Sequence, residues 1–202
     1  MMRAILIGGM LWTTLAGATS VLADQPSLIL VEEDWELSIG TPEPASCSPQ
    51  ITFFLSPAGD SDQTYFQLQM NYAAEEDFSS GGFHVAAVRN ENFLDEKRSV
   101  VQSVLQTTGD KVRWTSVMAY DSGRLYYALR DGYCSQWGTF GGPDYLVSMP
   151  AEGVSDLSGY DSSNSVAATD IGFGANRVQQ LVLREVRLLY SDGTTQTLNP
   201  EP

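Results

Sequence analysis

The stretch from Lys111 to Gly138, KVRWTSVMAYDSGRLYYALRDGYCSQWG, constrains the fold of this chain more than any other. Apolar and polar residues alternate on both sides of a short polar segment, as they do in strands with one buried face. The residues expected on the buried face are Val112, Trp114, Ser116, Met118 and Tyr120, followed by Leu125, Tyr127 and Leu129. Between them, Asp121-Ser122-Gly123 supplies the residues of a tight turn. The stretch predicts a β-hairpin with an extension that carries Cys134 and Trp137.

Short alternating segments also fill the rest of the chain. Leu28–Ile39 alternates except at Glu33, which interrupts the apolar face. Residues 98–106 (RSVVQSVLQ) fit a strand or a short helix, and their β-branched content favours a strand. Further strands are expected at 51–55, 65–72, 83–88, 145–149, 168–173, 179–190 and 194–198. Between 138 and 177 the Gly, Ser, Asp and Asn content predicts long surface loops. The pattern predicts an all-β fold, a single domain over residues 24–202 with two packed antiparallel sheets.

The N-terminal residues read as a signal peptide. Arg3 provides a positive start, residues 4–18 are largely apolar, and Val21-Leu22-Ala23 forms a cleavage-type site. We therefore expect residues 1–23 to be removed and the product to be secreted, to the periplasm, the cell surface or the medium. No later segment is apolar and long enough to span a membrane, so no membrane insertion is expected after cleavage.

Charge and cysteine content narrow the partners and the chemistry. The formal net charge of −14 repels phosphate backbones, so nucleic acid is not an expected partner. Two cysteines in an exported chain predict a disulfide between Cys47 and Cys134. A nucleophilic Cys134 is disfavoured, because His84 is the only histidine and no Cys/His/Asn arrangement is evident.

The hairpin also resembles a known family. The run W-x-S-V-x-A-Y-D-S-G-R-L-Y-Y-A-L-R-D-G (Trp114 to Gly132), the following Trp137 and the run V-R-L-L-Y-S-D-G (Val186 to Gly193) are similar to the concanavalin A-like lectin/glucanase jelly rolls. The likeness is greatest to the laminin G-like and pentraxin-like members. It implies a jelly-roll sandwich that binds a glycan or a protein, sometimes with calcium, and it does not imply catalysis.

One acidic run is the alternative catalytic candidate. Glu32, Asp34 and Glu36 have the spacing E-x-D-x-E, which places three carboxylates on one face of a strand. This spacing is similar to the signature of the jelly-roll glucanases and would suit a glycoside hydrolase or polysaccharide lyase. Its position close to the cleavage site and the polar Glu33 favour another interpretation, the solvated face of an N-terminal edge strand.

No cofactor is expected, with calcium as the alternative. Asp156, Asp161 and Asp170, together with Asn164, offer oxygen ligands in loop-like sequence, but no D-x-D-x-D-G run is present. Acidic residues in turns more often stabilise the turns themselves.

Aromatic residues are the candidate ligand contacts, because sugar faces stack on exposed rings. We expect these contacts at Tyr126, Tyr133, Trp137, Phe140 and Tyr145. The function favoured by the sequence is a lectin-like module without catalytic activity that binds an extracellular glycan or a cell-surface protein. A structural component of an envelope or assembly is a further alternative, and the oligomeric state is left open.

Overall fold

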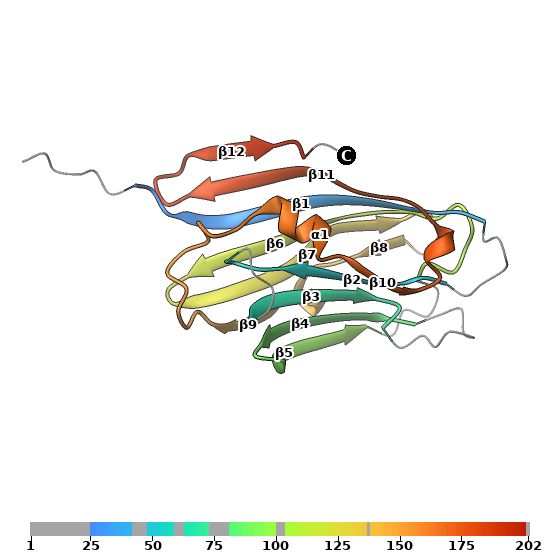
Figure 1. The fold of residues 1–202 in the computed structure, drawn as a ribbon, viewed down its shortest axis with the longest axis horizontal. Coiled ribbons are helices and arrows are strands. Elements are labelled where there is room, and N and C mark those ends of the chain that lie inside the picture. The colour runs from blue at the N-terminus through green and yellow to red at the C-terminus, as the bar shows by residue number, and fades with distance from the viewer. Residues whose placement is uncertain are drawn as a thin grey trace, which may run out of the picture.

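Two antiparallel sheets pack face to face in the computed structural model, which describes residues 25–41, 48–58, 63–72, 81–99, 104–136 and 138–200 (Figure 1). The seven-stranded sheet has the order β12 (Thr195–Leu198), β11 (Val178–Tyr190), β1 (Leu28–Ile39), β6 (Lys111–Asp121), β7 (Arg124–Cys134) and β8 (Gly138–Phe140), and β9 (Val147–Pro150) also pairs with β7. The five-stranded sheet has the order β10 (Asp170–Phe173), β2 (Gln50–Leu55), β3 (Thr64–Met70), β4 (Phe83–Arg89) and β5 (Asn92–Ser99). The predicted class, an all-β jelly-roll sandwich, is confirmed.

The β6–β7 hairpin forms as its sequence predicts. Asp121 pairs with Arg124, and Ser122 and Gly123 between them have φ values of 48° and 77°. Both positive values suit a two-residue turn whose twist matches that of the strands. The side chains of Val112, Trp114 and Met118 are buried on one face of β6, and the predicted apolar stripe of β7 is buried beside them. The hairpin therefore presents one face to the core, while its exposed residues lie on the other face, where Thr115 and Val117 are also buried.

Aromatic rings join the two sheets across the core. Phe53 of β2 lies with its ring centroid 5.3 Å from that of Trp35 and 4.9 Å from that of Trp114, both in edge-on geometry. Further along, Phe66 of β3 stacks on Tyr127 of β7 at 5.4 Å. Such ring pairs add directional contacts to the apolar area that the sandwich buries.

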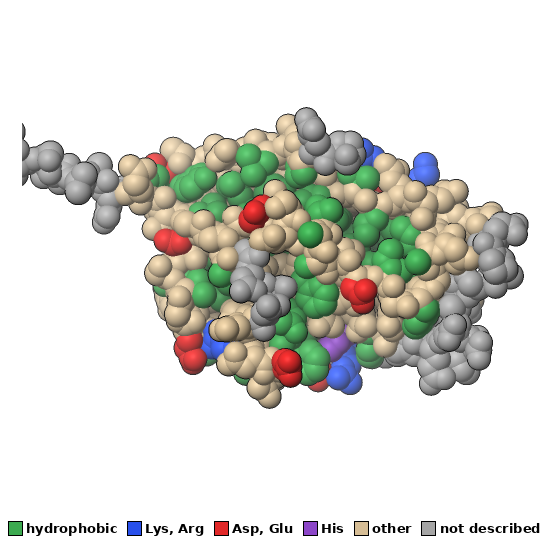
Figure 2. Space-filling model, in the orientation of Figure 1, with side chains coloured by type: hydrophobic (Ala, Val, Ile, Leu, Met, Phe, Trp, Pro, Cys, Tyr) green, Lys and Arg blue, Asp and Glu red, His purple; other side chains and the backbone are tan. Residues whose placement is uncertain are grey.

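One sheet has seven strands and the other five, and a short helix in a connecting segment packs beside the narrower sheet. The helix α1 (Ser162–Ala167) lies against β11 and β2, and Asp161 caps its N-terminus by accepting a hydrogen bond from the backbone N–H of Ser163. The two short 3₁₀ helices are η1 (Pro143–Tyr145) and η2 (Ala175–Arg177). Hydrophobic side chains gather on the face where β11 and β12 extend past the narrower sheet (Figure 2). There Leu28, Leu188 and Leu198 line a pocket of about 340 Å³.

Three expectations about the elements need correction. The strand expected at 98–106 is wrong: β5 ends at Ser99, and Val104 and Leu105 form a buried turn. The region 138–177 contains β9 and β10 where strands were expected at 145–149 and 168–173, but also β8 and α1, where only loops were expected. Strand β1 is not an edge strand, since it lies between β11 and β6. Among the described residues, no helix is long and apolar enough to cross a membrane.

Candidate functional site

Charged side chains collect on the outer face of the seven-stranded sheet, along its central strands. Because the core takes Val31, Trp35 and Leu37 of β1, the alternate residues of this strand point outward. The register places Glu32 beside Arg187 of β11, Asp34 beside Thr115 of β6, and Glu36 beside Arg113 of β6. The row of three carboxylates that the sequence predicts is therefore on one face, and cationic residues of the neighbouring strands lie next to it.

Arg187 is the centre of this network. Its Nε donates to Glu32 Oε2 at 2.9 Å, and its Nη1 donates to Asp34 Oδ2 at 2.7 Å and to Glu185 Oε1 at 2.6 Å. The hydrogen bonds that Arg187 donates to Asp34 and then to Glu32 raise the pKa of its guanidinium above the ordinary value. Two further contacts fix the carboxylates: Arg130 donates to Glu32 at 3.0 Å, and Thr115 Oγ1 donates to Asp34 at 2.6 Å.

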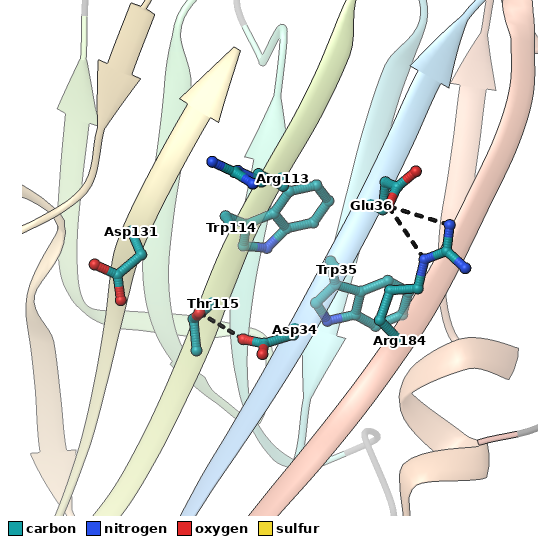
Figure 3. A pocket seen from close by; sticks show the side chains of 8 residues that line it. All are labelled: Asp34, Trp35, Glu36, Arg113, Trp114, Thr115, Asp131 and Arg184. Carbon is teal, nitrogen blue, oxygen red and sulfur yellow. Dashed lines mark hydrogen bonds and ion pairs between the residues drawn. The ribbon is translucent and has the colours of Figure 1, made fainter. Parts of the chain in front are cut away.

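Beside this network the outer face is hollowed into a pocket of about 280 Å³. Figure 3 shows the ion pair between Glu36 and Arg184 on one side of this pocket and the hydrogen bond between Asp34 and Thr115 on another. The Glu36 and Arg184 side chains are 3.1 Å apart. The described residues that line it are Asp34, Trp35, Glu36, Arg113, Trp114, Thr115, Asp131 and Arg184.

A second pocket of about 330 Å³ adjoins the first, because Glu36 and Arg113 line both. The ring of Tyr133 is 43% exposed, and the Arg113 guanidinium lies 5.5 Å from its centroid. Within the part of the chain that the structure describes, this pocket is lined by Glu36, Lys111, Val112, Arg113, Tyr133 and Ser135. We call the two pockets together the outer-face site.

The outer-face site offers groups for binding more readily than groups for hydrolysis. Among the described residues, the two adjoining pockets together present the exposed Tyr133, the hydroxyls of two further side chains, three carboxylates, two guanidinium groups and one lysine. The three carboxylates of β1 are all ion-paired, and Arg187 contacts two of them at once. A glycosidase needs one carboxyl that donates a proton and one that stays free to attack or to activate water. The contacts made by Glu32, Asp34 and Glu36 instead hold the sheet together and shape the pocket.

The aromatic residues expected to contact a ligand divide into two groups. Tyr126 and Tyr133 both lie on the outer face of β7, but only Tyr133 lines a pocket of the outer-face site. Phe140 and Tyr145 are buried, with ring centroids 4.8 and 5.7 Å from that of Phe83. These two rings are core residues, because they close the sandwich beside β4. Trp137 lies outside the described residues.

The remaining sequence candidates have simple structural roles or lie outside the described residues. Asp156 and Asp161 accept hydrogen bonds from the backbone N–H groups of Ser158 and Ser163, so both stabilise their own turns. Asp170 is exposed at the start of β10. Among the described residues, no group of three or more potential metal ligands is found. Cys134 is buried, and its expected partner Cys47 lies outside the described residues.

Sequence reasoning did not select the cationic residues of the site. Lys111 and Arg113 alternate with buried residues of β6, so the same pattern that predicted the core also placed them on the outer face. Their position next to Tyr133 follows from the β6–β7 register, in which Arg113 pairs with Tyr133 beside a bulge. Pairing the two strands of the predicted hairpin residue by residue is the signal that could have placed Lys111 and Arg113 near Tyr133.

Comparison with known proteins identifies no family. No protein-family model matches the chain, and no curated protein matches it. Among solved structures, the crystal structure of an ancestral congerin aligns with a TM-score of 0.39 and 10% sequence identity, covering 81% of this chain and 95% of the congerin.

Proposed function

We propose that this chain is an exported, non-catalytic β-sandwich module that binds an extracellular glycan through the outer-face site. One observation carries the proposal: two adjoining pockets combine an exposed tyrosine ring with polar groups fixed on neighbouring strands. The resemblance of the hairpin to lectin-type jelly rolls supports the same function.

The chemistry of the site suits a sugar. A pyranose ring has an apolar face that stacks on an aromatic side chain and a rim of hydroxyls that need directed hydrogen bonds. Tyr133 supplies the ring in one pocket, and Asp34, Glu36 and Thr115 supply acceptors and a hydroxyl in the adjoining one. The ion pairs of Glu36 and Asp34 hold these groups in place before a ligand arrives, which lowers the entropy cost of binding.

Tyr133→Ala tests the proposal against a matched control. The purified chain is screened on a glycan array with and without calcium, and the affinity of each hit is measured by calorimetry. We expect Tyr133→Ala to weaken binding by about tenfold or more, since stacking on one ring contributes on the order of 1–2 kcal/mol. Tyr126→Ala changes the same residue type on the same face of β7 but outside both pockets, and it should leave the affinity unchanged. Absence of binding to any glycan, or equal losses in the two variants, would overturn the proposal.

A further inference from the structure

Basic side chains are concentrated on the outer face of the seven-stranded sheet. The chain as a whole has a formal net charge of −14 with only 11 Lys and Arg residues. Six of these 11 lie on this one face: Lys111, Arg113, Arg124, Arg130, Arg184 and Arg187. The same face also carries the carboxylates Glu32, Asp34, Glu36, Asp131 and Glu185, so its charges nearly balance, and the field near each cation depends on whether a carboxylate already pairs with it.

Only some of the six cations form ion pairs with carboxylates. Arg130, Arg184 and Arg187 each form an ion pair with a carboxylate of β1. Lys111 and Arg113 have no ion-pair partner within 4.0 Å among the residues that the structure describes. These two uncompensated cations line the same pocket as the exposed ring of Tyr133.

The surroundings of Lys111 and Arg113 favour an anionic group on the ligand. Of the described residues that line their pocket, Glu36 is the one carboxylate, and its Oε2 is already 3.1 Å from the Arg184 guanidinium. The hydroxyl of Ser135 also lines the pocket and accepts a hydrogen bond from the Lys111 backbone N–H at 3.2 Å, which leaves its own O–H free to donate to a ligand. Asp131 lines the adjoining pocket, so the anion is expected on the Lys111 side of Arg113.

Building on the proposed function, we propose that the outer-face site binds an acidic glycan, whose carboxylate or sulfate lies between Lys111 and Arg113 while a neighbouring sugar ring stacks on Tyr133. Bidentate hydrogen bonds from a guanidinium suit both kinds of anion, and a lysine adds a mobile point charge. A neutral glycan would displace water from these two cations without supplying an opposite charge, so it should bind more weakly than an acidic one.

The test compares three oligosaccharides of equal length: a uronate oligomer, its neutral carboxyl-reduced counterpart, and a sulfated derivative of that neutral oligomer. Calorimetry with the unaltered chain should show the uronate, the sulfated derivative or both binding at least about tenfold tighter than the neutral oligomer. That preference should shrink at high salt, because the Debye length falls from about 10 Å at 0.1 M to about 3 Å at 1 M. Which acidic oligomer binds more tightly tells a carboxylate ligand from a sulfate ligand.

Variants separate this inference from the proposed function. The double substitution Lys111→Gln with Arg113→Gln should abolish the preference for acidic oligomers, measured within this variant as the ratio of its affinities for the acidic and the neutral oligomer. Arg124→Gln removes a cation from the same face outside both pockets and should change nothing. Equal affinity for neutral and acidic oligomers, with Tyr133→Ala still weakening both, would overturn the acidic ligand and leave glycan binding standing. No binding of any oligosaccharide would overturn both proposals.

Discussion

At the scale of single residues, the most unusual side chain is Glu33, a carboxyl on the core face of β1. It is 1% exposed, and it accepts hydrogen bonds from Trp35 Nε1 at 3.0 Å and from the Tyr160 hydroxyl at 2.8 Å. Burial raises the pKa of Glu33, and the hydrogen bonds from Ser165, Trp35 and Tyr160 only partly oppose this. The nearby Glu33 charge in turn helps burial to raise the pKa of Tyr160.

The raised pKa gives Glu33 a defined effect on stability. Between its ordinary value and the raised value, the folded state holds a proton that the unfolded state has released. The contribution of Glu33 is therefore most favourable at low pH and is lost as pH rises through the raised pKa. Glu33→Gln removes this titration. As pH rises across that window, the free energy of unfolding of the variant should therefore increase relative to that of the parent by up to about 1.4 kcal/mol per pH unit.

Urea unfolding of both proteins from pH 4 to pH 8 checks this prediction. The difference in the free energy of unfolding between the two proteins is taken at each pH, so that the contributions of groups that titrate alike in both cancel. Glu96→Gln is a contrasting control: His84 and Arg98 hold the pKa of the exposed Glu96 below its ordinary value of 4.5, so the titration of Glu96 itself affects stability only at and below that value, outside the window expected for Glu33. A parallel pH dependence of Glu33→Gln and the parent would contradict the assignment.

Glu33 also shows where sequence reasoning stopped. The alternation of β1 identified this residue as an interruption of the apolar face. What satisfies the carboxyl is Tyr160, which is 127 residues away in the sequence and belongs to a segment read as a surface loop. A period-2 pattern states which face a side chain takes, but it carries no information about a partner delivered by a distant loop.

At the scale of elements, ion pairs link β11 to β1 across the outer face. Arg187 is the only cation that contacts three carboxylates among the described residues, on Glu32, Asp34 and Glu185. Arg184 on the same strand contacts Glu36 alone. The cost of losing Arg187 therefore includes the mutual repulsion of three carboxylates on adjacent strands, whereas the loss of Arg184 leaves a single half-exposed carboxylate.

Arg187→Gln and Arg184→Gln form a matched pair of tests. We expect Arg187→Gln to lower the free energy of unfolding by about 1–2 kcal/mol at low salt, and Arg184→Gln by no more than about 0.5 kcal/mol, because exposed single pairs contribute little. The loss in Arg187→Gln should shrink in high salt, which screens the repulsion. Chemical denaturation with urea, which does not add ionic strength, measures both. Similar losses in the two variants would show that the three-carboxylate cluster has no special role.

How well each element could be predicted depends on its burial. Strand β1 and the β6–β7 hairpin were predicted within a residue or two, since each buries one face and carries its more exposed residues on the other. Strand β5 was missed because its sequence NFLDEKRS is mostly exposed at the edge of its sheet and has no apolar alternation. Val104 and Leu105 led to the wrong prediction of a strand at 98–106. Both are buried, but they lie in a turn, and an apolar residue can be buried in a turn as well as in a strand.

At the scale of the whole molecule, the sandwich depends on contacts that cross between the sheets. Phe53 is 4% exposed and contacts Trp35 and Trp114, which lie on adjacent strands of the opposite sheet. The neighbouring Phe54 points to the outer face of the five-stranded sheet, where its ring centroid lies 5.4 Å from that of Tyr65 on the adjacent strand β3. Phe53 therefore makes contacts between the two sheets, whereas its sequence neighbour Phe54 makes a ring contact within one sheet. Comparing the two residues distinguishes the two kinds of contact.

Substitution of each by alanine tests whether the two sheets unfold as one unit. Phe53→Ala should lower the free energy of unfolding by about 3–5 kcal/mol, because it leaves a cavity beside two tryptophan rings. Phe54→Ala should cost no more than about 1.5 kcal/mol, since its ring is only partly buried. If the sheets are cooperative, tryptophan fluorescence and far-UV circular dichroism will report one coincident urea transition for each variant, with the slope of the parent. A transition seen by fluorescence before the loss of β-sheet signal would instead show that the sheets separate before they unfold.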